Sequence, residues 1–124
     1  MKWCLLFLLA FTPPLATLAQ EVPKDKWLDA MTVTIPTYFC QPEQYFRQCF
    51  DVTAEECEQV AQSGARNCIT KMENQIPDLL AHPVDSRAWG NRLGTCAGVA
   101  YEATLADKHK SDPKCQDARN WKGG

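Results

Sequence analysis

Residues 53–77 read TAEECEQVAQSGARNCITKMENQIP, and this stretch predicts the clearest helix of the chain. The hydroxyl of Thr53 can accept the amide N–H of Glu56, and the Glu56 carboxylate can reach back, an arrangement that begins helices. Apolar and small residues then recur mostly in steps of three and four, at positions 57, 60, 61, 64, 68, 72 and 76. We therefore expect a helix over about 54–75 that ends or bends at Pro77, because proline lacks the backbone N–H that the helix needs.

The region before this helix predicts two shorter helical segments. Apolar residues follow helical spacing over 27–35, and residues 43–50 gather aromatic side chains on one face. Pro36 and Pro42 are expected to punctuate the region, each in the first turn of a short helix. Residues 20–26 are polar, and we expect them to be loosely held.

The region after it predicts a second long helix over about 86–107, with an apolar stripe that includes Trp89, Leu93 and Cys96. Glycine recurs every four residues along this helix, at Gly90, Gly94 and Gly98. Each glycine costs about 1 kcal/mol in helix propensity, so we expect a packing reason for them. The small residues would let another helix approach closely within the chain; the alternatives are a groove or a homodimer seam.

A last short helix is expected from Pro113 onward, and no stretch alternates with period two for long enough to predict a strand. The first 19 residues combine one lysine, a short apolar run and small residues before a cleavage position, which is typical of a secretory signal peptide. We expect the mature chain to begin at Gln20, or failing that at Glu21, and to form one exported domain over 20–124. The predicted fold is all-α, a small disulfide-stapled helical bundle of about four to five helices.

Six of the seven cysteines lie after the signal peptide, and an even number in an exported chain predicts three disulfides. Cys57 and Cys68 stand about 16 Å apart on one helix, too far to bond to each other. An antiparallel hairpin turning near residue 53 would instead pair them with the preceding segment. The predicted bridges are Cys40–Cys68, Cys49–Cys57 and Cys96–Cys115, and the competing pairing joins Cys68 to Cys96. The cysteine spacings suit no compact zinc site, so neither a metal nor a cofactor is predicted.

The charge balance argues against a nucleic-acid partner. Thirteen basic residues face fifteen acidic ones, for a formal net charge of −2, and nucleic-acid binding favours a basic surface. No later segment is long and apolar enough to predict a membrane span. The histidines, carboxylates and hydroxyls fall into no recognisable catalytic pattern, so the sequence favours a non-enzyme without deciding the matter.

Aromatic residues are the strongest candidates for a binding surface. They cluster over residues 38–50, and a further tyrosine follows the glycine stripe. Aromatic side chains are enriched at protein interfaces, although they also fill protein cores. The candidate binding residues are Tyr38, Phe39, Tyr45, Phe46 and Tyr101.

The stretch from Cys96 to Glu102 has the pattern C-x-G-x-x-Y-E and resembles segments of small periplasmic inhibitor and immunity proteins. The resemblance covers seven residues and transfers no functional residue, but it implies a protein partner. We therefore expect an exported binding or inhibitory protein of immunity type, located in the bacterial periplasm or outside the cell, with no evident catalytic site. The alternatives are a small envelope hydrolase whose site is assembled from scattered residues, and a structural component of an envelope or secretion assembly.

Overall fold

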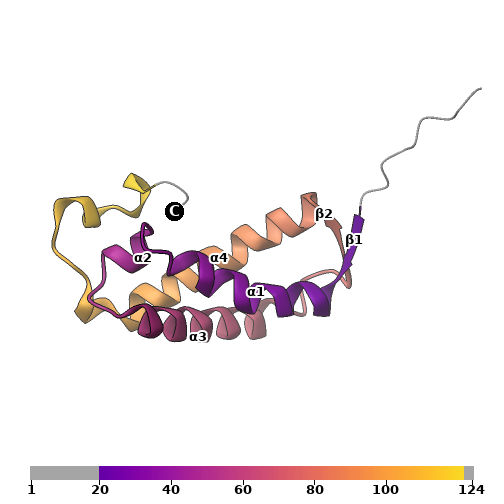
Figure 1. Ribbon diagram of the computed structural model, residues 1–124. Helices are drawn as coiled ribbons and strands as arrows, with labels where there is room; N and C mark the ends of the chain where they lie inside the picture. Colours follow the sequence, from indigo (N-terminus) through magenta and orange to yellow (C-terminus); the bar gives the residue numbers. More distant parts are fainter. Residues whose placement is uncertain (1–19, 122–124) are drawn as a thin grey trace, which may run out of the picture.

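The computed structural model describes residues 20–121, in which three long helices form the body of the molecule (Figure 1). The elements follow in the order β1 (Gln20–Pro23), α1 (Lys24–Phe39), α2 (Tyr45–Gln48), α3 (Ala54–Met72), β2 (Leu79–His82) and α4 (Val84–Thr104). Helix α3 packs against both α1 and α4. The two short strands lie at one end of the bundle, and α2 lies with the C-terminal segment at the other (Figure 1). The prediction of a small, disulfide-stapled helical bundle is confirmed. The predicted signal peptide lies outside the described residues.

Helix α3 begins where the capping motif predicts, but only half of that motif forms. The Glu56 amide donates to the Thr53 hydroxyl at 3.1 Å, while the Glu56 carboxylate accepts a hydrogen bond from Lys108 Nζ at 2.6 Å. The buried face of α3 is made of small residues, which lets α4 approach closely. A Cβ on Gly64 would lie 3.3 Å from the Ala100 Cβ, so glycine is the residue that this contact admits.

Helix α1 continues through Pro36, which corrects the prediction that this proline starts a new short helix. Ile35 and Phe39 are buried on either side of the proline, and their burial requires the helix to continue. The Thr37 hydroxyl also donates to the Val33 carbonyl at 2.8 Å, which satisfies a backbone group beside the interruption. Tertiary packing here outweighs the local preference of proline.

Residues 20–23 form strand β1 rather than a loose segment. The strand pairs with β2 in antiparallel register, from Gln20 opposite His82 to Pro23 opposite Leu79. Leu80 on β2 is fully buried, so the strand pair covers that end of the core. The two strands are four residues each and far apart in the sequence, which explains why no alternating pattern predicted them.

The disulfide pairing differs from the predicted set at every bridge, and the competing pairing of Cys68 with Cys96 is the one that forms. The bonds are Cys40–Cys57, Cys49–Cys115 and Cys68–Cys96, with Cα separations of 5.8, 5.4 and 6.0 Å. The prediction assumed that Cys57 and Cys68 must reach the same neighbouring element. Instead, Cys57 bonds to Cys40 at the end of α1, and Cys68 bonds to Cys96 on α4, because α3 packs between these two helices.

The C-terminal segment forms three short 3-10 helices: η1 (Ala106–Lys108), η2 (Pro113–Gln116) and η3 (Ala118–Asn120). The predicted short helix from Pro113 is η2, which holds Cys115. The segment is held by Cys49–Cys115 and by two backbone bonds, from the Asp51 N–H to the Lys108 carbonyl and from the Lys110 N–H to the Cys49 carbonyl. Among residues 20–121, the helices lack the combination of length and apolar character that a bilayer crossing requires.

Candidate functional site

Two surface grooves flank helix α4, and both are lined by its exposed residues Asn91, Thr95 and Val99, which we call the α4 ridge. Val99 is 63% exposed although it is aliphatic. One groove separates α4 from α3 and has a volume of about 710 Å³; the other separates α4 from α1 and has a volume of about 500 Å³. Both volumes fall within the range of ligand-binding pockets in proteins.

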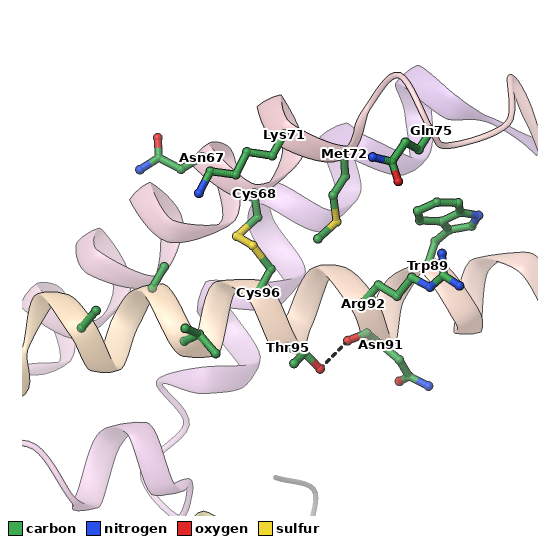
Figure 2. A pocket seen from close by; sticks show the side chains of 13 residues that line it. Asn67, Cys68, Lys71, Met72, Gln75, Trp89, Asn91, Arg92, Thr95 and Cys96 are labelled. Carbon is green, nitrogen blue, oxygen red and sulfur yellow. Dashed lines mark hydrogen bonds between the residues drawn. A yellow bond between two sulfur atoms is a disulfide. The ribbon is translucent and has the colours of Figure 1, made fainter.

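The α3/α4 groove has a covalent link between its walls. Its lining includes the Cys68–Cys96 disulfide, Lys71 and Met72 from α3, and Trp89 and Arg92 from α4. Figure 2 shows the disulfide bridging the two helices, with Met72 reaching from α3 toward α4. The linkage fixes the separation of the helices, so the groove is expected to keep its width when a ligand binds.

The charge in this groove has one sign. Of residues 20–121, Lys71 and Arg92 are the only charged ones whose side chains line it, in a chain whose net charge is −2. The guanidinium carbon of Arg92 lies 4.8 Å from the centroid of the Trp89 ring, a cation–π contact that favours this orientation of the arginine (Figure 2). An apolar surface bordered by two cations is complementary to a ligand that is both apolar and anionic.

The α1/α4 groove has a different lining. It includes Tyr38 and Phe39 from the end of α1, Phe46 from α2, and Gly94 and Glu102 from α4. Glu102 is the only charged residue that lines it in the part of the chain that the structure describes. The two grooves therefore carry opposite charges on the two sides of one helix.

The three glycines of the stripe differ in how closely they are packed against neighbouring side chains. A Cβ on Gly98 would lie 3.1 Å from the Phe46 ring, so a side chain there would have to displace the ring by a few tenths of an ångström. A Cβ on Gly90 would lie 3.9 Å from Trp27, an ordinary contact, and one on Gly94 would have no neighbour within 4 Å. The expectation that Gly94 lies where two backbones meet is therefore wrong within this chain. The predicted homodimer through Gly90, Gly94 and Gly98 stays a prediction.

The candidate aromatic residues divide between core and surface. Phe39, Tyr45 and Tyr101 are buried, and the Tyr101 side chain is fully inaccessible. Tyr38 is 39% exposed, and Phe46 is partly buried. The Phe39 and Phe46 rings stack with their centroids 4.1 Å apart. Of the five, Tyr38, Phe39 and Phe46 line the α1/α4 groove; Tyr38 and Phe46 are accessible there, while the buried Phe39 ring contributes mainly by supporting Phe46.

Tyr45, Glu102 and His109 form a hydrogen-bonded chain that the sequence did not predict. The Tyr45 hydroxyl donates to Glu102 Oε1 at 2.7 Å and lies 3.1 Å from His109 Nε2. Burial, followed by the hydrogen bond to Glu102, raises the pKa of Tyr45 well above its ordinary value. The phenol therefore stays protonated and acts as a donor that orients Glu102, and not as a base or nucleophile.

Lys71 and Arg92 are the residues that sequence reasoning did not place in a site, whereas the position of Glu102 after the glycine stripe did place it beside the candidate binding surface. Lys71 and Arg92 lie on different helices, and only their packing brings them to one groove. The available signal for Glu102 was its position one helical turn after Gly98. Within residues 20–121, no cluster of histidine, cysteine and carboxylate groups could hold a metal ion.

Comparisons with known proteins give one match. A family model described as NttA, T2SS substrate NttA, matches residues 21–109, which include both grooves except for Ala118. No curated protein and no solved structure matches the chain.

Proposed function

Since the chain belongs to the family described as T2SS substrate NttA, and is thus an exported protein, we propose that it works after export as a binding module for another protein. T2SS denotes the type II secretion system. The three disulfides fit a location in the periplasm or outside the cell, where thiols are oxidised. The proposed docking surface is the α3/α4 groove.

The observation that carries this proposal is the combination of shape and charge in that groove. Its apolar lining continues onto the exposed Val99 of the α4 ridge. Lys71 and Arg92 border it, and no acidic side chain among the described residues lines it. The occupant that fits is an amphipathic segment with an apolar face and flanking carboxylates. Recognition of an amphipathic helix in an apolar groove is a common mode of peptide binding.

The dimensions of the groove suit a helix of moderate length. Its α4 wall extends from Trp89 to Ala103, a rise of about 21 Å in an α-helix. A partner helix of about 14 residues would span it. An inhibitory role, as the resemblance to inhibitor and immunity proteins implies, is a special case in which the bound segment belongs to an enzyme.

A hydrolase remains the alternative from another class. The histidine, tyrosine and carboxylate that converge are those of the Tyr45 chain, which lies outside the α3/α4 groove. Tyr45 is buried, and its proton is committed to Glu102. This arrangement favours a structural role for the chain over general acid or base catalysis, which needs a group that reaches substrate.

The proposal is tested with two fluorescently labelled amphipathic peptides of about 14 residues, identical except for flanking glutamates in one and lysines in the other. Fluorescence anisotropy measures their binding to the mature protein. We expect the glutamate peptide to bind at least about tenfold more tightly, because it pairs with Lys71 and Arg92. The double variant Lys71→Glu/Arg92→Glu should reverse this preference.

The matched control is Lys26→Glu/Arg87→Glu, which changes the net charge equally at two exposed cations outside the groove. Its preference should equal that of the unmodified protein. Equal binding of the two peptides, no binding of either, or a preference that persists in Lys71→Glu/Arg92→Glu would contradict the proposal.

A further inference from the structure

The α1/α4 groove combines a carboxylate with aromatic rings at one end. Gly98 lies against the Phe46 ring, and Glu102 follows Gly98 by four residues, so the two are neighbours on the helix surface. Phe39 stacks on Phe46 and also lines the groove. The carboxylate of Glu102 therefore stands beside an aromatic wall.

Three features of this end of the groove favour a cation. Within residues 20–121, Glu102 forms no ion pair, and its recorded partner is the neutral Tyr45 hydroxyl. Among the described residues, the rings of Trp89 and Trp121 make cation–π contacts, whereas the Phe39 and Phe46 rings in this groove do not. Glu102 also lies in the last turn of α4, where the helix dipole favours positive charge.

The middle of the groove leaves room for a main chain. A Cβ on Gly94 would have no neighbour within 4 Å, whereas a Cβ on Gly98 would press on Phe46. A peptide backbone can approach a helix closely only where such a side chain is absent. The open position lies about 12 Å along the helix from Glu102, so an extended lysine side chain and the Glu102 side chain must span this distance together.

From this arrangement we infer that the α1/α4 groove is a second binding site, which takes a lysine side chain presented by an apolar segment of another protein. The ammonium pairs with Glu102 beside Phe39 and Phe46, the alkyl stem lies along the aromatic wall, and the segment's main chain lies over Gly94. Tyr45 positions the carboxylate without touching the ligand. The site is independent of the proposed function, because the two grooves share only the α4 ridge.

The test uses a short peptide of alanine and leucine with one central lysine, and a matched peptide with glutamine in its place. Binding is followed by ¹H–¹⁵N correlation spectra of the mature protein, in which glycine amides are well separated. We expect the lysine peptide to shift the amides of Gly94 and Glu102, and to bind about tenfold more tightly than the glutamine peptide, as a charge-assisted hydrogen bond provides.

Two variants separate the site from the fold. Glu102→Gln keeps an acceptor for Tyr45 but removes the charge, and should lower the affinity for the lysine peptide about tenfold. Gly94→Leu fills the open position and should abolish binding while the spectrum remains that of a folded protein. Asp29→Asn removes an exposed carboxylate from α1 outside the groove and should leave binding unchanged.

Other occupants give different results. Equal affinity for hexylamine would show that the main chain contributes nothing, and would overturn a protein segment as the ligand. A dimer in solution that Gly94→Leu dissociates would make the groove a seam between two copies and would also overturn the inference. Unchanged lysine-peptide binding in Glu102→Gln or Gly94→Leu, or no measurable binding to the unmodified protein, would do the same. The Lys71→Glu/Arg92→Glu variant should bind the lysine peptide as tightly as the unmodified protein does, because both residues lie outside this groove. A failure of the proposed function is therefore distinguishable from a failure of this inference.

Discussion

The α3/α4 and α1/α4 grooves share the α4 ridge of Asn91, Thr95 and Val99, yet they offer a ligand opposite charges. The first is fixed by a disulfide between its walls and carries two cations. The second is lined by glycine and aromatic rings and carries one carboxylate. The comparison shows that one helix can present two chemically distinct surfaces when neighbouring helices pack on opposite sides of it.

The largest expected effect comes from removing the covalent link of the first groove. The Cys68→Ala/Cys96→Ala variant opens a loop of 28 residues, and we expect it to lower the free energy of unfolding by about 3–4 kcal/mol. Denaturant unfolding of the mature protein measures the change. A variant as stable as the unmodified protein would show that packing alone fixes the width of this groove.

The next effect distinguishes two glycines of the second groove. Gly98→Leu forces a side chain into the Phe46 ring and should destabilise the protein by about 1–3 kcal/mol. Gly94→Leu meets no neighbour and should leave stability unchanged or raise it by less than about 1 kcal/mol, because leucine has the higher helix propensity. Thermal unfolding of both variants measures the two changes in stability. Equal destabilisation of the protein by the two substitutions would contradict the finding that the space beside Gly94 is open.

A smaller effect concerns the tyrosine behind the aromatic wall. The Tyr101 hydroxyl donates to the Phe46 carbonyl at 2.7 Å, and burial raises the pKa of Tyr101 to about 12. Tyr101→Phe leaves that buried carbonyl without this donor and should cost about 1–2 kcal/mol. The change should weaken binding in the α1/α4 groove but not in the α3/α4 groove.

The same pKa gives a pH dependence. The folded-state pKa lies above that of an unfolded tyrosine, about 10, so the contribution of Tyr101 is complete below pH 10. It is lost as the pH rises toward 12, because the unfolded state then releases the proton first. Stability measured by denaturant across this range should fall less steeply in Tyr101→Phe. Parallel curves for the two proteins would contradict the shift.

The smallest effect on stability is expected at the shared ridge. Val99→Asp changes an exposed side chain and should alter the free energy of unfolding by about 0.5 kcal/mol or less. The same change adds negative charge beside the α3/α4 groove and should weaken the glutamate peptide more than the lysine peptide. Anisotropy titrations with both peptides measure the difference. Equal weakening would mean that the ridge acts through contact area alone.

The sequence predicted what depends on local spacing. The Thr53 cap and the small-residue seam located α3, and the apolar stripe located α4 to within a few residues at each end. Strand β1 escaped prediction because its hydrogen-bond partners lie in β2, about sixty residues away. The disulfide pairing was wrong for a related reason: Cys57 and Cys68 share a face of α3, but that face meets α1 near one end and α4 near the other.

The candidate site was predicted only in part. Aromatic residues adjacent in sequence diverge in space, since Tyr45 enters the core while Phe46 lines a groove. Lys71 and Arg92 come from separate helices, so no local pattern relates them. Residues that act together through tertiary packing leave no periodic signal in a single sequence.

One experiment tests the opposed grooves directly: ¹H–¹⁵N spectra of the labelled mature protein recorded with the amphipathic peptide that carries flanking glutamates (the glutamate peptide) and, separately, with the alanine and leucine peptide that carries one central lysine (the lysine peptide). Opposed grooves predict that the glutamate peptide shifts the amides of Lys71 and Arg92, and that the lysine peptide shifts those of Gly94 and Glu102. Both peptides should also shift the ridge residue Thr95, which lines both grooves. If both peptides shift the same groove, or if neither shifts any of these amides, the two sides of α4 are not distinct binding surfaces.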